Sequence, residues 1–367
     1  MEKAFKYRIY PNEKQKILIQ KTFGCARFVY NYYLDKRIKE YEEEKITLSY
    51  YDCCKDLTQL KKDLIWLKEP DKDSLQKSLK DLDMAYQNFF KQHFGFPKFK
   101  SKKDKHKSYR TSCTNNNIRF LSNKIKLPKL GYLKIRDKQI PQGRILNATI
   151  SQEHDGKYYC CLCCTDVEHK ELPKTNQNIG IDLGLIDFAI MSDGTKINNP
   201  KFYEKSEQKL VKLQRELSRK TIGSNRWNKA RIKVANLQKH ISNQRKDFLQ
   251  KLTTNIVKTY DVIAIEDLDV QSMKEADSTV RNKRVSDVSW SEFRRMLTYK
   301  TQWYGKQLSI VDRYYPSSQI CHCCEHRDSK KSEDIRFWIC PECGSELDRD
   351  VNAAINILNE GLKILYL

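Results

Sequence analysis

The sequence predicts a chain of several domains that combines an α/β domain with a small β-barrel. At 367 residues the chain is long enough for two or three separate cores. Short strand-like segments separated by turn signals run to about Val167, which is typical of a small barrel. From residue 178 onward, apolar strands alternate with helical segments, which indicates an α/β domain with a mixed sheet.

The chain also carries a large positive charge. Lysine and arginine number 69 against 47 acidic residues, a formal charge of +22. A surplus of this size favours a polyanionic partner, nucleic acid above all, although a merely basic protein is the alternative. The sequence has no run of eighteen apolar residues and no secretory signal. We therefore expect an intracellular protein, cytoplasmic and nucleoid-associated, that makes no membrane contact.

The N-terminal region predicts one strand followed by helices. Residues 3–10 alternate apolar and basic side chains, as a strand does. Helical spacing follows from residue 13 to about residue 90, and its aromatic side chains are interpreted as core rather than as a base-stacking surface. In the last helical piece Gln76, Lys77 and Lys80 lie away from the apolar row. There they could contact DNA or simply be solvated.

A cluster of cysteines falls inside one predicted strand. It consists of Cys160, Cys161, Cys163 and Cys164. Because side chains three positions apart in a strand face opposite sides of the sheet, these thiols cannot easily share a metal ion. We interpret them as small buried apolar residues.

Acidic residues occur in apolar elements at three places in the second half of the chain. Asp182 lies within an apolar strand, Glu266 and Asp267 end another, and Asp348 and Asp350 precede an apolar helical run. A charge in a buried strand is costly unless it is paired or binds a metal. The side chains of Glu266 and Asp267 face opposite ways, so only one of them can approach Asp182. An aspartate at the start of a helix is either an N-cap or a metal ligand.

Carboxylates that converge from these three places would bind two divalent cations. Magnesium is the expected ion, because it prefers hard oxygen ligands. A pair of such ions can activate water and stabilise both the attacking and the leaving oxygen of a phosphodiester displacement.

Two long helices are predicted at residues 202–220 and 226–260, and both expose many basic side chains. Among these, Arg215, Arg219, Arg226 and Lys229 are candidates for contacting a phosphate backbone. Solvation is the alternative role for each of them. Residues 271–288 are polar, which suits a mobile lid.

Four cysteines near the C-terminus have the spacing of a structural zinc site. They are Cys321 and Cys324, then Cys340 and Cys343, separated as C-x2-C, fifteen residues, C-x2-C. The extra Cys323 could compete for the ion, but the spacing from Cys321 favours Cys324.

Four motifs occur in one order: GIDLGL around Asp182, AIEDL around Glu266, PSSQICHCC with CPECG, and DRDVNAAINIL around Asp350. These motifs carry a resemblance to the TnpB proteins of insertion-sequence transposons, relatives of the compact type V CRISPR effector nucleases. KAFKYRIYP, GCARFVYN and FPKFKSKK extend it over nearly the whole chain. Four spaced motifs in one order make this resemblance specific.

The resemblance implies an RNase H-like (RuvC-type) nuclease domain with an inserted zinc ribbon, preceded by a wedge β-barrel with a helical recognition insert. On this basis the wedge barrel covers residues 1–10 and 95–170, the helical insert 11–94, a linker 171–177, the nuclease domain 178–316 and 346–367, and the zinc ribbon 317–345. It also implies that Asp182, Glu266 and Asp350 are the catalytic magnesium ligands, with Asp350 chosen over Asp348 because it directly precedes VNAA.

The resemblance further implies an RNA-guided, magnesium-dependent DNA endonuclease with two catalytic Mg²⁺ ions and one structural Zn²⁺. A guide RNA from the transposon end, one protein for each guide, would direct the protein to double-stranded DNA beside a short target-adjacent motif. Gln76, Lys77, Lys80 and Thr111 are the candidates for reading that motif. The alternatives are a guided DNA-binding regulator that does not cut, a strand-joining transposase, and an unguided RNase H or junction nuclease.

Overall fold

The structure is a computed structural model that describes residues 1–104, 107–169, 171–269, 279–329, 332 and 335–366. The chain divides into two compact units, Met1–Glu168 and His169–Leu367, and each is described by itself. Within the described residues, no helix has the length and apolar character to cross a membrane.

The first unit contains a seven-stranded sheet in which every neighbouring pair is antiparallel. Its strands are β1 (Lys3–Tyr10), β2 (Lys107–Ser112), β3 (Arg119–Leu121), β4 (Lys124–Leu127), β5 (Gly131–Ile135), β6 (Arg144–Gln152) and β7 (Tyr158–Thr165), in the order β2-β6-β7-β1-β5-β4-β3. β2 and β3 are the outermost strands of this order, and within the described residues they are not hydrogen-bonded to each other. Closure into a barrel therefore remains a prediction.

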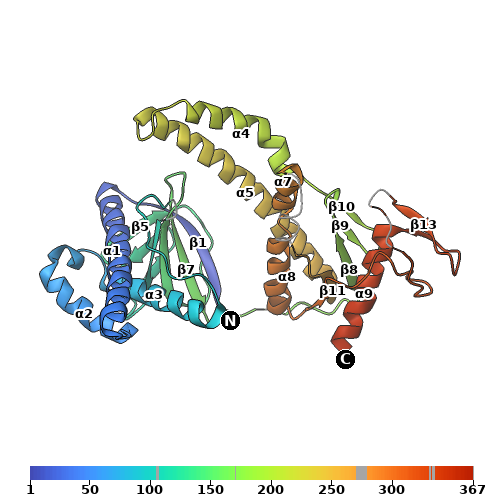
Figure 1. Cartoon of the computed structure of the whole chain (residues 1–367), viewed down its shortest axis with the longest axis horizontal. Helices are drawn as coiled ribbons and strands as arrows, with labels where there is room; N and C mark the ends of the chain where they lie inside the picture. The colour runs from blue at the N-terminus through green and yellow to red at the C-terminus, as the bar shows by residue number, and fades with distance from the viewer. Residues whose placement is uncertain (105–106, 170, 270–278, 330–331, 333–334, 367) are drawn as a thin grey trace. The chain divides into compact units, whose positions relative to one another are not determined.

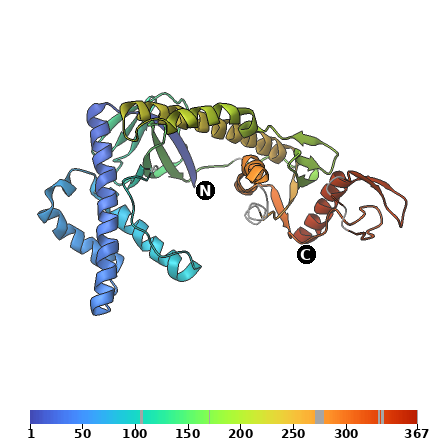
Figure 2. The same ribbon diagram turned by 45° about the horizontal axis from the view of Figure 1, so that its top comes forward.

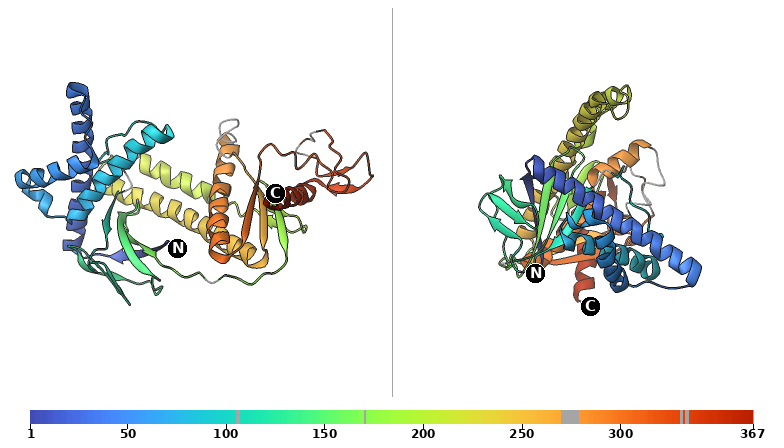
Figure 3. Two further views of the ribbon diagram at one scale, coloured as in Figure 1. Left: turned by 90° about the horizontal axis from the view of Figure 1, so that it is seen from below. Right: turned by 90° about the vertical axis from the view of Figure 1, so that its left-hand side faces the viewer.

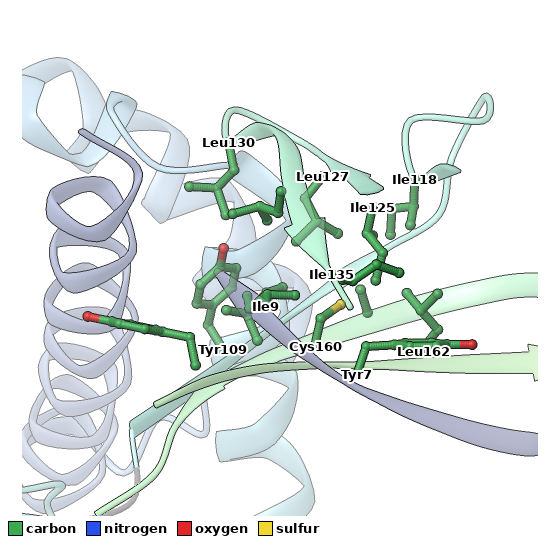
Figure 4. Packing of buried hydrophobic residues seen from close by; sticks show 14 of the residues in the cluster. Tyr7, Ile9, Tyr109, Ile118, Ile125, Leu127, Leu130, Ile135, Cys160 and Leu162 are labelled. Atoms are coloured by element: carbon green, nitrogen blue, oxygen red, sulfur yellow. The ribbon is translucent and has the colours of Figure 1, made fainter. Parts of the chain in front are cut away.

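Alternation along the strands builds the core of this sheet (Figure 4). On β1 the side chains of Phe5, Tyr7 and Ile9 are buried, whereas the basic residues between them are not. On β7 Cys160 and Cys164 are in the same core. The interpretation of these two cysteines as buried apolar residues is confirmed, while Cys161 and Cys163 on the opposite face are only partly buried.

Three helices accompany this sheet: α1 (Glu13–Glu44), α2 (Tyr50–Asp63) and α3 (Lys72–Gln92), with a short 3-10 helix at Ile65–Lys68. In Figure 3, α1 is the long blue helix. It begins at a capping box in which Asn12 and Gln15 exchange hydrogen bonds. Its aromatic residues Tyr30 and Tyr33 are buried against α2 and α3, so the interpretation of the aromatic row as core is confirmed for these residues.

The second unit contains a mixed five-stranded sheet of order β10-β9-β8-β11-β12. The strands are β8 (Asn178–Leu183), β9 (Asp187–Met191), β10 (Lys196–Asn198), β11 (Val262–Glu266) and β12 (Gln307–Val311). β11 is parallel to both β8 and β12, and β8, β9 and β10 are antiparallel neighbours. The predicted mixed sheet is confirmed.

Helices cover both faces of this sheet (Figure 1). One face packs on α5 (Asn225–Thr259), α7 (Thr279–Val288) and α8 (Trp290–Tyr304), and the other packs on α9 (Arg349–Tyr366). α4 (Phe202–Ser218) lies beside α5 in both Figure 1 and Figure 2. Of the predicted lid, residues 271–278 lie outside the described residues, whereas the remaining part forms α7, which buries Val285 and Val288 in the core.

Two glycines allow α9 to lie directly against the sheet. A Cβ atom on Gly180 of β8 would lie 2.0 Å from the carbonyl oxygen of Ala354, and one on Gly361 of α9 would lie 2.5 Å from Cβ of Ala264. Since Cβ atoms do not approach this closely, any larger residue would push α9 away. This contact brings the start of α9 to the ends of β8 and β11.

Candidate active site and zinc site

The two central strands bring Asp182 and Glu266 to one edge and one face of the sheet. In the parallel pairing of β8 with β11, Gly180 is opposite Ala264 and Ile181 is opposite Ile265, so Asp182 and Glu266 come next. Side chains alternate along a strand, and the isoleucines face α5 and α8. Asp182 and Glu266 therefore lie on the α9 face.

Asp267 is separate from this site, as the alternation predicts. It is paired with Arg294 and, at 3.1 Å, with Arg313. The prediction that only one residue of the Glu266–Asp267 pair can join Asp182 is confirmed.

Electrostatics show that the three acids share one neighbourhood. Burial raises the pKa of Asp182 to about 8, and the negative charges of Glu266 and then Asp350 add to the effect. Burial also raises the pKa of Glu266, whose Oε1 accepts a hydrogen bond of 2.6 Å from Ser317 Oγ. Perturbed carboxyl groups of this kind are typical of functional sites.

Asp350 and Asp348 have different partners. Asp348 Oδ1 accepts hydrogen bonds from the backbone N–H groups of Asp350 (3.0 Å) and Val351 (3.2 Å), so it caps α9, and its Oδ2 pairs with Lys196 at 2.7 Å. Asp350 is 8% exposed and forms ion pairs with Arg336 and, at 3.1 Å, with Arg349.

A surface pocket opens beside two of the three acids. Asp182 and Asp350 line it together with residues 183–187 at the loop between β8 and β9, and Arg336 and Arg349 lie at its wall. The loop is held by Asn199, whose Nδ2 donates to the carbonyl oxygen of Leu185 at 2.9 Å. The pocket therefore offers acids for a cation beside two guanidinium groups that can face an anion.

The donor set fits magnesium by its chemistry, since it consists of carboxylate oxygens from three elements. The oxygens of the three acids are further apart than the ligands of a single ion: within the described residues, only the cysteine group has three or more ligand atoms within 4.8 Å of one another. Arg336 and Arg349 pair with Asp350, while burial and the nearby charges of Glu266 and Asp350 raise the pKa of Asp182 and so favour its protonated form.

The cysteine group is Cys321, Cys324, Cys340 and Cys343, the set that the spacing predicts. Sγ atoms are 3.7 Å apart for Cys321–Cys343 and 3.6 Å apart for Cys324–Cys340. Hydrogen bonding with Ser345 lowers the pKa of the Cys343 thiol to about 6, which favours the thiolate that zinc binds. Cys323 is exposed and outside the group, so the choice of Cys324 agrees with the geometry.

Three residues near the acids are not predicted from the sequence: Ser317, Arg336 and Arg349. Arg349 directly follows Asp348, the possible capping residue. Arg336 precedes β13 (Phe337–Ile339), which pairs with β14 (Glu346–Asp348) in the zinc segment. Ser317 lies in the PSSQICHCC motif, but nothing in that motif indicates a contact with Glu266, and no local pattern marks Arg336. An arginine directly before a candidate metal-binding aspartate is the one signal that could have identified Arg349.

The candidate nucleic-acid contacts lie in different surroundings. Gln76 is exposed, Lys77 lines a polar pocket between α3 and β2, and Lys80 pairs with Asp83 at 3.0 Å. Thr111 is 1% exposed and donates its hydroxyl to Asp71 at 2.6 Å. Its role in base reading therefore requires this hydrogen bond to break.

The four candidates on α4 and α5 or at the end of α4 are all exposed: Arg215, Arg219, Arg226 and Lys229. They flank the turn that joins the two helices. Over the described ranges, no carboxylate forms an ion pair with any of the four. Their charge is thus available to a phosphate backbone.

Three family profiles match the chain. One described as a probable transposase covers residues 162–277, one described as a Cas12f1-like TNB domain covers residues 290–357, and one described as a helix-turn-helix domain covers residues 1–45. In this structure residues 1–45 form β1 and the single helix α1.

Two full-length relatives carry names that describe RNA-guided DNA endonucleases. One, from Streptomyces pristinaespiralis, is 37% identical over 99% of this chain and 90% of its own length. The other, InsQ of Escherichia coli K12, is 33% identical over 99% of this chain and 93% of its own length. A solved Cas12f1–sgRNA–target DNA complex aligns over 98% of this chain and 99% of that chain at 14% identity, with a TM-score of 0.37, too low to support a structural argument.

Proposed function

Because the chain belongs to the TnpB family of transposon-encoded RNA-guided DNA endonucleases, we propose that it cuts DNA at the pocket lined by Asp182 and Asp350, with Glu266 beside Asp182. The observation that carries this proposal is the position of the three acids. They come from β8, β11 and α9 and lie on one face at one edge of the sheet.

We propose that the three carboxylates hold two magnesium ions and that the four cysteines hold zinc. Bound magnesium would supply an activated water and charge stabilisation for phosphodiester hydrolysis. The chain's own contribution is to fix Asp182 and Glu266 on adjacent strands and Asp350 at a capped helix start. Arg336 and Arg349 lie where they can offset the negative charge of a DNA phosphate.

The strand order of the second unit, with three antiparallel strands followed by two parallel ones, supports the proposed RNase H-like domain. We retain the wedge and helical-insert boundaries as proposals. The proposed partners are one guide RNA for each protein and double-stranded DNA beside a target-adjacent motif, with Gln76, Lys77, Lys80 and Thr111 near the motif. The exposed basic residues of α4 and α5 are proposed to follow the nucleic-acid backbone.

The test is to co-express the chain with the RNA that flanks its gene, purify the complex and sequence the RNA it retains. A matching duplex is then incubated with and without Mg²⁺. The wild type should cut only with Mg²⁺, and Asp182→Asn, which is nearly isosteric, should bind the duplex equally well without cutting. Retained cutting in this variant would refute the site, binding without cutting by the wild type would favour the regulator, and absence of a specific RNA would refute guidance.

A further inference from the structure

Ser317 connects the zinc-binding segment to a catalytic acid. It is four residues before the first zinc-ligand candidate, Cys321, and is 6% exposed. Its Oγ donates to Oε1 of Glu266 at 2.6 Å across 51 residues of sequence. No hydrogen bond or ion pair to the other oxygen, Oε2, is present within the described part of the chain, so that oxygen can face a metal ion.

The backbone that carries Ser317 is held by two buried asparagines of α9. Asn356 Nδ2 donates to the carbonyl oxygens of Ser317 (2.8 Å) and Ile320 (2.6 Å). Asn352 Nδ2 donates to the same Ile320 oxygen at 2.7 Å, and its Oδ1 accepts the N–H of His322 at 3.0 Å. The residues Asn352 and Asn356 are 1% and 3% exposed, so their amides have few alternatives to these partners.

These contacts form one connected unit. Asn352 and Asn356 are one helical turn apart, on the helix whose first turn contains Asp350. The segment that they hold carries Cys321 at one end and Ser317 at the other. The position of the Ser317 hydroxyl therefore depends on α9 and on the zinc-binding turn, both of which are fixed relative to Asp350.

We propose that Ser317 is a positioning residue for Glu266, and that the zinc-binding segment uses it to present the Glu266 carboxylate to the catalytic metals. This inference rests on the proposed function of the acids. A hydrogen bond to one carboxylate oxygen restricts rotation of the group and leaves the second oxygen aimed at the ion. Without it, Glu266 must lose that rotational freedom each time the metal binds.

The test compares Ser317→Ala with Ser317→Thr, which keeps the hydroxyl, and with the matched control Ser318→Ala one position along. Mn²⁺ binding to the full-length protein, without RNA, is measured by electron paramagnetic resonance of the free ion. Glu266→Gln serves as the reference for a damaged site. Ser317→Ala should weaken Mn²⁺ binding about tenfold, as expected for one lost charge-assisted hydrogen bond. Ser317→Thr should recover most of the affinity, and Ser318→Ala should equal the wild type.

Zinc content and thermal stability separate positioning from general damage. Ser317→Ala should keep its zinc and its duplex binding, and should raise the Mg²⁺ concentration for half-maximal cutting more than it lowers the maximal rate. Wild-type Mn²⁺ affinity in Ser317→Ala would overturn the inference. If instead wild type and Glu266→Gln bind Mn²⁺ equally, the metal site itself is refuted.

A second pair of variants tests the connection to α9. Asn356→Ala should weaken Mn²⁺ binding in the same direction as Ser317→Ala, although it contacts no catalytic acid. Asn359→Ala, an exposed asparagine of the same helix, is its control. An unchanged affinity in Asn356→Ala would show that Ser317 is held without the asparagine and would overturn this part of the inference.

Discussion

The backbone N–H of Asp350 donates a hydrogen bond to Oδ1 of Asp348, at 3.0 Å. One aspartate of the DRD motif thus caps α9 and holds the backbone of the other. Asp348 is occupied by this cap and by Lys196, while the Asp350 carboxylate faces the pocket. The two acids therefore have separable roles.

We predict that Asp350→Asn abolishes cutting, whereas Asp348→Asn keeps it at a reduced level. Asparagine is also a good N-cap, so Asp348→Asn loses mainly the ion pair with Lys196, about 1 kcal/mol or less for a partly exposed pair. Cleavage rates and melting temperatures of both variants provide the measurement. Equal loss of cutting in the two would show that both acids bind metal.

We predict that the metal-free protein loses stability as the pH rises, because of Asp182. Its pKa is about 8 in the folded protein, above the ordinary 3.8, so between these values the folded state binds more protons than the unfolded state. The loss is at most about 1.4 kcal/mol for each pH unit. Melting temperatures of the wild type and Asp182→Asn in magnesium-free buffer from pH 5 to 8 measure it.

The melting temperature of Asp182→Asn should rise steadily relative to that of the wild type as the pH increases across this range. Added Mg²⁺ should reduce the difference, because the ion stabilises the ionised aspartate. A gap that stays constant from pH 5 to 8 would mean that Asp182 is already ionised in the metal-free protein.

Arg336 competes with the metal for Asp350, and we predict that Arg336→Gln tightens Mn²⁺ binding several-fold. Its side chain is 39% exposed and can leave, whereas Arg349 is 14% exposed and is also held by a 2.8 Å hydrogen bond to the carbonyl oxygen of Ser332. Arg327→Gln, an exposed arginine in the zinc segment, is the control for the change in net charge. Weaker Mn²⁺ binding in Arg336→Gln would mean that the arginine orders Asp350 instead of blocking it.

The sequence was sufficient for the acids and the cysteines but not for the groups that hold them. Asp182 is recognisable because a charge inside an apolar strand needs a partner, and the cysteine spacing matches the geometry of one ion. Ser317 lies in a turn within the PSSQICHCC motif, and Arg336 lies just before β13. Their roles depend on tertiary contacts across 51 and 14 residues, which no local periodicity encodes.

Asp348 and Thr111 illustrate the same distinction in two ways. For Asp348, the sequence left cap and ligand as alternatives, and only the hydrogen bonds to Asp350 and Val351 select the cap. Thr111 was a candidate for contacting the target-adjacent motif. Its hydroxyl is instead buried and donates a hydrogen bond to Asp71, because α3 packs against β2. Packing between elements decides such cases.

We predict that removing Arg215 and Arg219 together weakens nucleic-acid binding and lowers the salt dependence. Each phosphate contact that is lost should reduce the slope of log affinity against log salt by about one. Fluorescence anisotropy of a labelled duplex on the guide complex, at several salt concentrations, measures it. The control removes Lys39 and Lys251, which are paired with Asp35 and Asp247 at 2.8 and 2.7 Å and contribute little free charge. Equal slopes in the two double variants would show that Arg215 and Arg219 are only solvated.

The last prediction concerns zinc. Cys340→Ser should lower the bound zinc and the melting temperature, because Cys340 is 1% exposed and lies in a small core with Cys321, Trp338 and Leu347 that has little apolar area besides the metal site. Cys323→Ser is the matched control, since this thiol is exposed and outside the four-sulfur group. It should retain one zinc per chain by elemental analysis. Full zinc content in Cys340→Ser would show that Cys340 is not a zinc ligand. Loss of zinc in Cys323→Ser would show that Cys323 binds the ion in place of Cys324.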